Sequence, residues 1–271
     1  MTGRVLADAY DVVLLDLDGV VYVGGQAVPY AVDTLRLARA AGVRLGFITN
    51  NASRTPEQIA KHLTELGVPA DPDEVVTSAQ AVATMISERY PAGTHVAVLG
   101  ADGLREALRA RELVPVAVGH DAAAIVSGYG PDVPWSDIMR AATRIRDGLP
   151  WFAANTDSTI PAAFGEAPGH GAQVELLSRF SGVVPPVAGK PAVPLFEEAR
   201  RRITGETVLM VGDRLDTDVL GAHRAGIDSL LVLTGVTTRE DLAHSRPGEL
   251  PTYVADDLRG LLQPASSLAA G

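Results

Sequence analysis

The chain has 271 residues, of which 46% are hydrophobic and 21% are charged, an ordinary composition for a folded globular protein. Its formal net charge of −10 argues against a nucleic-acid-binding protein, which needs a basic surface. The absence of cysteine excludes disulfide bonds, thiol nucleophiles and thiolate metal sites, so any metal must be bound by oxygen or imidazole ligands.

The scarcity of lysine and the absence of long apolar stretches are also informative. Only two of the 23 basic residues are lysines, Lys61 and Lys190, so each of them calls for a reason. The first residues lack the apolar stretch of a signal peptide, and the longest apolar runs fall far short of the roughly 20 residues of a membrane span. We therefore expect a soluble, cytoplasmic protein with neither membrane nor nucleic acid as a partner.

The N-terminal part alternates apolar runs with helical patterns. Its first run, VVLL at 12–15, shows no polar alternation and is typical of a strand buried on both faces of a parallel sheet. The next elements are predicted as a helix over 30–41, a strand over 43–48 and a helix from Pro56 to near Gly67. Thr55 and Gln58 form a capping box at the start of that helix. Glu57 precedes Lys61 by four residues, which predicts a surface ion pair and accounts for this lysine.

The middle of the chain has a strand–helix rhythm of its own. We predict strands over 95–99, 123–127 and 151–154, and helices over 103–111, 136–147 and 171–180. Polar stretches at 77–80 and 182–189 flank this region. It is therefore interpreted as an inserted α/β domain at 80–183, between a first core segment at 1–79 and a second at 184–271.

The C-terminal part returns to the first rhythm. Its predicted elements are helices over 194–202 and 217–225, with Gly226 closing the second, and strands over 208–211, 229–233 and 251–255. The tail from Pro264 is expected to fray. Alternating strands and helices indicate the α/β class, with a parallel sheet covered on both faces.

Four polar clusters follow or precede these core elements. Three come directly after predicted strands, and the fourth stands before the helix at 194: Asp16-Leu17-Asp18-Gly19, Thr49-Asn50-Asn51, Gly212 to Asp218, and Gly189-Lys190-Pro191. In an open parallel sheet, ligands bind beyond the carboxyl ends of the strands. We expect the four clusters to lie at one edge of one sheet.

The residue types in these clusters point to phosphoryl transfer. Three carboxylates at one sheet edge, from Asp16, Asp18 and Asp213, would repel one another unless a cation neutralised them. Oxygen ligands favour a hard ion, and Mg²⁺ suits a site that handles phosphate better than Ca²⁺ does. Short hydrogen-bond donors and the Lys190 ammonium would complete such a site. Aspartate is a competent nucleophile toward phosphorus, and a neighbouring carboxyl can act as general acid and base.

The motifs resemble those of the haloacid-dehalogenase-like (HAD) phosphatases, in particular the subclass of NagD, phosphoglycolate phosphatase, pyridoxal phosphatase and 4-nitrophenyl phosphatases. The resemblance runs nearly end to end and includes D-x-D-G, T-N-N, G-K-P and GDRLDTD in that order. It implies a Rossmann-like core with a large inserted α/β cap, small phosphorylated metabolites as substrates, and a homodimer formed through the cap.

The resemblance also implies a role for each motif residue. Asp16 is expected to be the nucleophile and a metal ligand, and Asp18 the general acid and base, binding metal through its backbone carbonyl. Asp213 is expected to be the third protein ligand of Mg²⁺, with Asp218 orienting it. Substrate phosphate would be bound by three neighbouring donors and one distant lysine: Thr49, Asn50, Asn51 and Lys190.

Three further positions have two interpretations each. Asn155 and Asp157 resemble the N-x-D segment of the subclass, which reaches the substrate, but an ordinary turn is an equal alternative. His170 is interpreted as a surface-loop histidine, with substrate contact as the alternative. Asp216 is interpreted as a helix N-cap rather than a site residue.

The leading hypothesis is a Mg²⁺-dependent phosphatase for small phosphate monoesters, with glycerol 3-phosphate as the substrate that the pattern resembles most. Phosphatases for 2-phosphoglycolate, pyridoxal phosphate, sugar phosphates or nucleotides are alternatives within the same class. A non-catalytic phospho-acceptor domain is the alternative from a different class. It would also combine aspartates, threonine and lysine at a sheet edge, but it would not need an inserted domain of roughly 100 residues.

Overall fold

The computed structural model describes residues 5–162, 165–246 and 249–270. The chain forms two compact units, which are described separately. The first unit consists of Met1–Thr49, Ile59–Val76 and Ala199–Gly271. The second consists of Asn50–Gln58 and Thr77–Glu198. The predicted domain boundaries at 79/80 and 183/184 stay a prediction.

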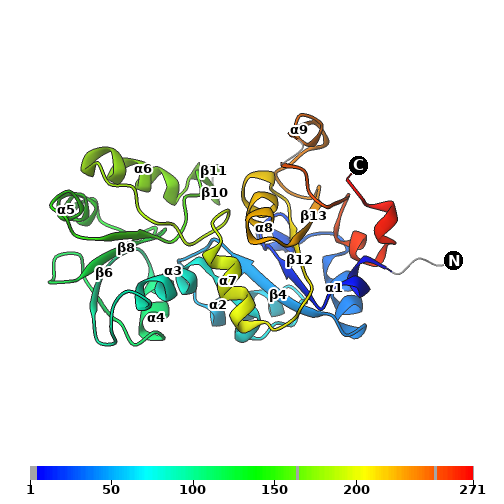
Figure 1. Cartoon of the computed structure of the whole chain (residues 1–271), viewed down its shortest axis with the longest axis horizontal. Helices are drawn as coiled ribbons and strands as arrows, with labels where there is room; N and C mark the ends of the chain where they lie inside the picture. Colours follow the sequence, from blue (N-terminus) through cyan, green and yellow to red (C-terminus); the bar gives the residue numbers. More distant parts are fainter. Residues whose placement is uncertain (1–4, 163–164, 247–248, 271) are drawn as a thin grey trace. The chain divides into compact units, whose positions relative to one another are not determined.

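A six-stranded sheet forms the centre of the first unit. Its strand order is β14 (Tyr253–Ala255), β13 (Asp228–Val232), β12 (Val208–Gly212), β1 (Val12–Leu15), β4 (Arg44–Thr49) and β5 (Val75–Thr77). The pairs from β14 through to β4 are all parallel. The blue strand β4 and the orange strand β13 therefore belong to one sheet, although most of the chain separates them in sequence (Figure 1). All four residues of β1 are buried, as expected for a strand covered on both faces.

Helices and short segments complete the first unit. A hairpin, β2 (Tyr22–Val23) with β3 (Gln26–Ala27), follows β1. The helices are η1 (Leu6–Ala9), α1 (Ala31–Ala40), the greater part of α2 (Pro56–Glu65), η2 (Pro72–Glu74), η3 (Leu215–Val219), α8 (Leu220–Ala225), α9 (Arg239–Ala243), η5 (Leu258–Leu262) and η6 (Ala265–Ser267).

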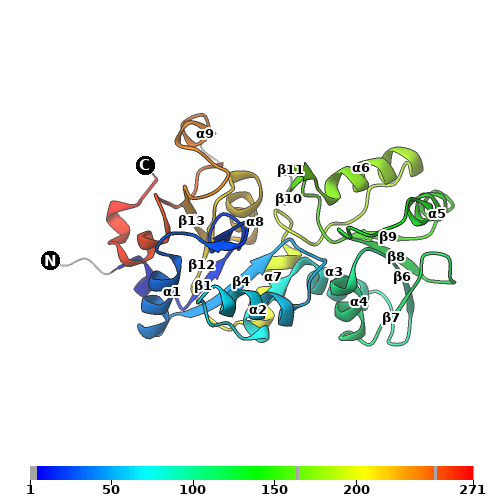
Figure 2. The same cartoon turned by 180° about the vertical axis from the view of Figure 1, so that it is seen from behind.

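The second unit is built on a four-stranded sheet of its own. The order is β7 (Val114–Val116), β6 (His95–Leu99), β8 (Ala124–Ser127) and β9 (Trp151–Ala153), and all pairs are parallel. In Figure 2, α3 (Ser78–Ser87) and α4 (Asp102–Arg109) lie on one side of this sheet, with α5 (Trp135–Arg146) and α6 (His170–Ser181) on the other. A hairpin, β10 (Thr159–Ala162) with β11 (Gly165–Pro168), precedes α6. Helix α7 (Pro194–Arg202) spans the point at Glu198–Ala199 where the chain passes back to the first unit.

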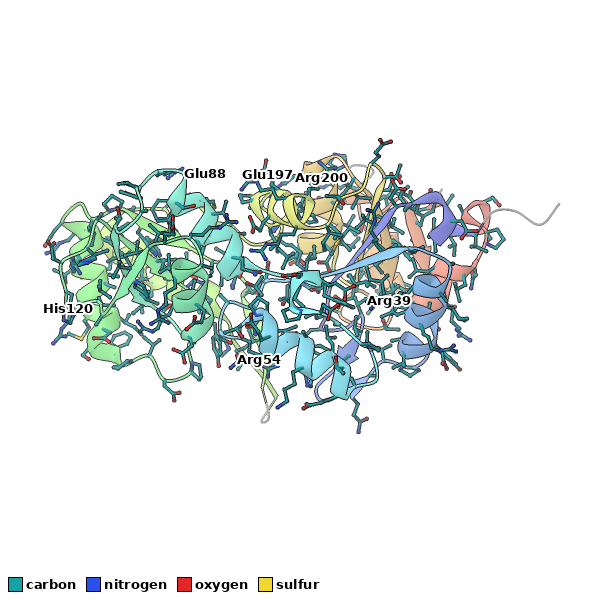
Figure 3. All side chains as sticks on the ribbon, turned by 90° about the horizontal axis from the view of Figure 1, so that it is seen from below. Arg39, Arg54, Glu88, His120, Glu197 and Arg200 are labelled. Carbon is teal, nitrogen blue, oxygen red and sulfur yellow. The ribbon has the colours of Figure 1, made fainter. Side chains whose placement is uncertain are left out.

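Charged side chains cover the outside of these elements. Glu88, His120 and Arg200 are exposed, and their side chains extend away from the ribbon (Figure 3). None of the described helices has the length and apolar character needed to cross a membrane.

The predicted α/β class with a parallel sheet is confirmed, and the predicted strands and helices are found within a few residues of their expected bounds. The capping box at the start of α2 forms as expected: the Thr55 amide donates to Gln58 Oε1 at 3.0 Å, and the Gln58 amide donates to Thr55 Oγ1 at 3.4 Å. Lys61 pairs with Glu65, at 3.8 Å, so the predicted partner Glu57 is wrong.

Two sequence interpretations need correction. The polar residues at 77–80 form a second capping box, between Thr77 and Gln80, which begins helix α3; no helix was predicted there. The C-terminal tail is not frayed over its described residues, because the Val254 amide donates to the Leu268 carbonyl at 2.9 Å and the Ala270 amide donates to Thr252 at 3.1 Å. These backbone bonds hold the tail beside β14.

Candidate functional site

Three neighbouring strands of the first unit end in polar motif residues. β1 and β12 pair in parallel with Leu15 opposite Val211, so Asp16 and Asp213 both follow at the same edge of the sheet. The Asp16 amide donates to the Val211 carbonyl at 2.9 Å, which continues the ladder to the aspartate itself. On the other side of β1, Thr49 is the last, buried residue of β4.

The carboxylates of Asp16, Asp213 and Asp218 form a cluster in the first unit, called here the carboxylate cluster. One oxygen from each lies within 4.8 Å of the others. Asp213 and Asp218 are almost completely buried, and Asp16 is 9% exposed. The cluster therefore gathers three acidic groups where water can do little to screen them.

The loop after β13 holds Asp213 in place. The Val236 amide donates to Asp213 Oδ2 at 2.7 Å, and the Thr237 amide donates to the Asp213 carbonyl at 3.1 Å. In the same loop, Thr234 Oγ1 donates to the Gly19 carbonyl at 2.6 Å. One loop thus fixes both Asp213 and the turn that follows the first motif.

Three glycines leave room for the carboxylates. A Cβ on Gly19 would lie 2.5 Å from Asp213 Oδ2, and one on Gly235 would overlap the same oxygen. A Cβ on Gly212 would overlap the Asp218 side chain. Gly19 also has a φ of +83°, a conformation that other residues adopt with strain. The close approach of backbone to carboxylate explains why glycine stands at these positions.

Asp218 reaches the cluster from the π-helical turn η3. Its Oδ2 accepts a hydrogen bond from the Arg214 amide at 3.1 Å. Asp216, in the same turn, is not a helix N-cap as predicted: Arg214 occupies the N-cap position. Arg214 instead binds both Asp216 oxygens, at 3.0 and 2.8 Å, and this guanidinium holds the pKa of Asp216 below its usual value.

The D-x-D-G motif forms a tight turn that separates its two aspartates. The amides of Val21 and Tyr22 donate to the Leu17 carbonyl at 2.9 and 3.1 Å, and the Gly19 amide donates to the Tyr22 carbonyl at 2.8 Å. Asp16 consequently stays nearly buried while Asp18 is exposed. The two carboxyl groups therefore lie in different environments.

The donor set of the carboxylate cluster fits a hard divalent cation. Two unit charges about 5 Å apart repel by about 3 kcal/mol at an effective dielectric constant of about 20, and the cluster holds three such pairs. A cation removes this cost, and oxygen-only ligands select Mg²⁺ or Ca²⁺ over softer metals. Among the described side chains of the first unit, those of Asp16, Asp213 and Asp218 are placed to hold such an ion together.

The second unit contains another group of motif residues, arranged around Asn50. Asn50 Oδ1 accepts a hydrogen bond from the Lys190 amide at 2.7 Å, and Asn50 Nδ2 donates to the Lys190 carbonyl at 3.0 Å. Lys190 is 2% exposed. A Cβ on Gly189 would lie 2.6 Å from Asn50 Oδ1, so glycine is needed at this contact as well. The T-N-N and G-K-P motifs are therefore joined by side chain to backbone.

Asn155 and Asp157 also contact Asn50. Asn155 Nδ2 donates to the Asn50 carbonyl at 2.7 Å, and Asn50 Nδ2 donates to Asp157 Oδ1 at 2.7 Å. The Asp157 amide donates to Asn155 Oδ1 at 3.1 Å, and this hydrogen bond stabilises a turn within the segment. The segment 155–157, the N-x-D loop, is thus a turn whose two polar side chains both bind one motif residue. Sequence reasoning did not anticipate this contact.

Asn51 stabilises a local turn, whereas His170 is buried and contacts the N-x-D loop. Asn51 Oδ1 accepts from the amides of Ser53 and Arg54, at 2.9 and 3.0 Å, and so organises the turn before α2. His170 is the first residue of α6 and is 2% exposed, so its interpretation as a surface-loop histidine is wrong. Its Nδ1 lies 2.8 Å from the Asn155 carbonyl, and burial lowers the pKa of His170 to about 4.

The motif residues therefore form two groups. Asp16, Asp213 and Asp218 gather in the first unit, where Thr49 and Asp18 lie at or near the same sheet edge. Lys190, Asn155 and Asp157 gather around Asn50 in the second. Asn50 follows Thr49 directly in the chain, so one peptide bond joins the two groups of motif residues.

Comparison with known proteins identifies the family. The family model for haloacid dehalogenase-like hydrolases matches residues 13–113, and a HAD-hydrolase-like model matches residues 187–261; together they cover well over half of the chain. The chain belongs to the haloacid dehalogenase-like hydrolases. The resemblance stated from the motifs is confirmed.

Individual members of this hydrolase family match over nearly the whole chain. A D-glycerol 3-phosphate phosphatase of Mycobacterium tuberculosis is 43% identical over 265 residues, covering 97% of the chain and 74% of that protein. A 5'-nucleotidase of Bacillus subtilis is 35% identical over 248 residues, covering 90% of the chain and 94% of that protein.

A solved structure of the family supports the fold directly. The crystal structure of a glycerol phosphate phosphatase from Mycobacterium tuberculosis in complex with magnesium aligns with a TM-score of 0.95 at 41% identity. The alignment covers 99% of this chain and 81% of the other. The α/β arrangement described above is therefore that of a family member.

Proposed function

We propose that this hydrolase is a Mg²⁺-dependent phosphatase that cleaves small phosphate monoesters through an aspartyl-phosphate intermediate, with glycerol 3-phosphate as its substrate. The observation that carries this proposal is the carboxylate cluster at the end of β1 and β12, in a chain whose relatives are phosphatases. An acidic cluster with oxygen ligands only is suited to binding a cation beside a phosphoryl group.

Asp16 and Asp18 carry the covalent chemistry. A carboxylate oxygen of Asp16 attacks phosphorus, and the bond from phosphorus to the ester oxygen breaks as the acyl-phosphate bond forms. Asp18 donates its carboxyl proton to the departing alkoxide, which leaves as the alcohol. Water then attacks the same phosphorus, the Asp18 carboxylate takes a proton from it, and phosphate leaves with the Asp16 carboxylate restored. The greater exposure of Asp18 supports the proton-transfer role.

Asp16, the backbone carbonyl of Asp18, and Asp213 would hold Mg²⁺, with Asp218 orienting the set or binding the ion itself. When bound, Mg²⁺ neutralises negative charge on the phosphoryl oxygens and aligns them for attack. Thr49, Asn50 and Asn51 would donate hydrogen bonds to these oxygens, and Lys190 would supply a positive charge.

Substrate choice is assigned to the insertion. We assign residues 1–79 and 184–271 to the catalytic core and residues 80–183 to an inserted cap that selects small substrates over large phosphoproteins. Asn155 and Asp157 of the N-x-D loop are assigned to substrate binding. A cytoplasmic location and a homodimer formed through the cap belong to the same proposal.

Glycerol 3-phosphate is favoured because the relative at 43% identity is named for that substrate. The relative at 35% identity is named a 5'-nucleotidase, which keeps nucleotides among the alternatives. Sugar phosphates, 2-phosphoglycolate and pyridoxal phosphate are the others. The net charge of −10 repels any of these anions, so attraction must be local, from Mg²⁺ and Lys190.

The test is a panel of phosphorylated metabolites assayed for kcat/KM with Mg²⁺. We expect glycerol 3-phosphate to be hydrolysed with the highest kcat/KM and with many phosphates released per protein molecule. A higher kcat/KM for a nucleotide or sugar phosphate would replace the substrate assignment. Release of no more than one phosphate per molecule would contradict the phosphatase and favour the phospho-acceptor alternative.

A further inference from the structure

A buried histidine of the second unit makes one hydrogen bond, and that bond leads toward Lys190. The His170 Nδ1 atom lies 2.8 Å from the Asn155 carbonyl oxygen. A carbonyl oxygen can only accept, so Nδ1 carries the proton and Nε2 carries the lone pair. Within the described part of the chain, Nε2 is buried and has no hydrogen-bond partner. The hydrogen bond from Nδ1 therefore connects His170 to the N-x-D loop.

The two residues beside His170 bring the backbone of α6 against the same loop. The Gly169 amide donates to the Ser158 carbonyl at 2.8 Å, and the Gly171 amide donates to the Asp157 carbonyl at 2.8 Å. A Cβ on Gly171 would lie 2.5 Å from the Thr156 carbonyl oxygen, and one on Gly169 would overlap the Asp157 carbonyl. Residues 169–171, called here the Gly-His-Gly clamp, therefore hold the N-x-D loop by side chain and backbone together.

Hydrogen bonds connect the N-x-D loop to Asn50, and Asn50 to the backbone of Lys190. Asn155 Nδ2 donates to the Asn50 carbonyl at 2.7 Å, and the Asn50 side chain binds both the amide and the carbonyl of Lys190. Asn155, Asn50 and Lys190 are all at least nine-tenths buried. A continuous path of buried hydrogen bonds thus runs from the start of α6 to the backbone of the lysine.

We propose that His170 is a positioning residue, which acts through Asn155 and Asn50 to hold the Lys190 backbone and so aim its ammonium at substrate phosphate. The part of this that concerns phosphate rests on the proposed function, whereas the hydrogen-bond path stands on the contacts alone. Residues that orient metal ligands commonly change activity by roughly 10- to 100-fold when they are replaced, and we expect a loss at the lower end of that range for a residue that orients a lysine.

The variants separate the hydrogen bond from the packing. His170→Leu fills the buried space without a donor, whereas His170→Asn places an amide N–H close to the position of Nδ1. Ile145→Val is the control, because Ile145 belongs to the apolar core of the second unit and has no part in the path. It removes one buried methyl group and lowers stability modestly.

Two readouts are measured on the full chain. The first is kcat/KM for 4-nitrophenyl phosphate with Mg²⁺, together with the inhibition constant of inorganic phosphate. The second is hydrogen–deuterium exchange in the peptide that contains the Lys190 amide, which needs no activity. We expect His170→Leu to lower kcat/KM roughly tenfold, to weaken phosphate inhibition and to speed exchange at Lys190. His170→Asn should restore all three to within a few-fold of the wild type, and Ile145→Val should alter none.

Three results would overturn the proposal: equal impairment of His170→Leu and His170→Asn, no change at Lys190 in either variant, or the same loss of activity in Ile145→Val. A wild-type protein that hydrolyses no phosphate monoester would defeat the proposed function instead. In that event, faster exchange in His170→Leu alone would still support the path, and unchanged exchange would overturn it.

Discussion

The side chain of Asn50 binds both polar backbone atoms of Lys190, accepting from its amide at 2.7 Å and donating to its carbonyl at 3.0 Å. The two residues stand 140 positions apart in the chain. Such a bidentate contact fixes the path of the backbone at the lysine through its amide and carbonyl groups. Asn50 is therefore the connection on which the second group of motif residues depends.

Replacement of Asn50 tests this dependence. Asn50→Asp removes the amide donor to Lys190 and sets a carboxylate against Asp157 Oδ1, so we expect kcat/KM to fall at least roughly tenfold and stability to drop by about 2 kcal/mol. Steady-state kinetics and urea unfolding measure the two effects. Wild-type values for both would show that the contact is not needed.

The two lysines offer a matched pair. Lys190 is 2% exposed, so its buried position leaves little room for the larger, planar guanidinium of arginine. Lys61 lies on the surface of α2 beside Glu65. We expect Lys190→Arg to lower kcat/KM by roughly 100-fold and Lys61→Arg to leave it unchanged. Equal activity in the two variants would remove the special role assigned to Lys190.

The glycine beside Asp213 should control metal affinity. A Cβ in Gly235→Ala would overlap Asp213 Oδ2, which must then move away from the carboxylate cluster. We expect the Mg²⁺ concentration for half-maximal activity to rise roughly tenfold. Gly25→Ala is the control, because a Cβ there meets nothing within 4 Å. An unchanged Mg²⁺ requirement in Gly235→Ala would contradict the tight fit around Asp213.

Asp16→Asn tests the nucleophile. The amide keeps the shape of the side chain but cannot form the acyl-phosphate, so we expect turnover of 4-nitrophenyl phosphate to be abolished while the circular dichroism spectrum stays that of the wild type. Because the change also removes one of three neighbouring negative charges, thermal stability without Mg²⁺ should rise. Activity near the wild-type value would exclude Asp16 as nucleophile.

His170 predicts a pH dependence of stability. Its pKa is lowered to about 4 in the folded protein against an ordinary 6.5, so the unfolded chain binds the extra proton between these values. Stability from this group is present above pH 6.5 and is lost as the pH falls toward 4. Between pH 7 and pH 5 the loss should be about 2 kcal/mol.

His170→Asn supplies the comparison, because other groups titrate equally in both proteins. The difference between wild type and variant in the free energy of unfolding, measured with urea at pH 7 and pH 5, should shrink at the lower pH. A difference independent of pH would mean that the histidine titrates normally when folded.

Local patterns in the sequence were enough to predict most strands of the two parallel sheets and most of the longer helices, but not the edge strands β5 and β7 or the two short hairpins. VVLL at 12–15 and VLMV at 208–211 are apolar on both faces, which only a covered parallel strand requires. The rule that ligands bind beyond the carboxyl ends of such strands then predicted where Asp16 and Asp213 belong. Helix α3 was missed because its cap, Thr77 to Gln80, is polar enough to resemble a linker.

Only the tertiary structure decided the contacts between distant segments. Asp218 joins the carboxylate cluster because a π-helical turn brings it there, and its place five residues after Asp213 cannot show this by itself. The burial of His170 depends on glycines that let α6 approach the N-x-D loop. The sequence by itself determined the chemistry available, since residue types and strand patterns are local properties. The structure decided which groups touch, because such contacts depend on how separate segments of the chain pack, as between Asn50 and Lys190, which stand 140 positions apart.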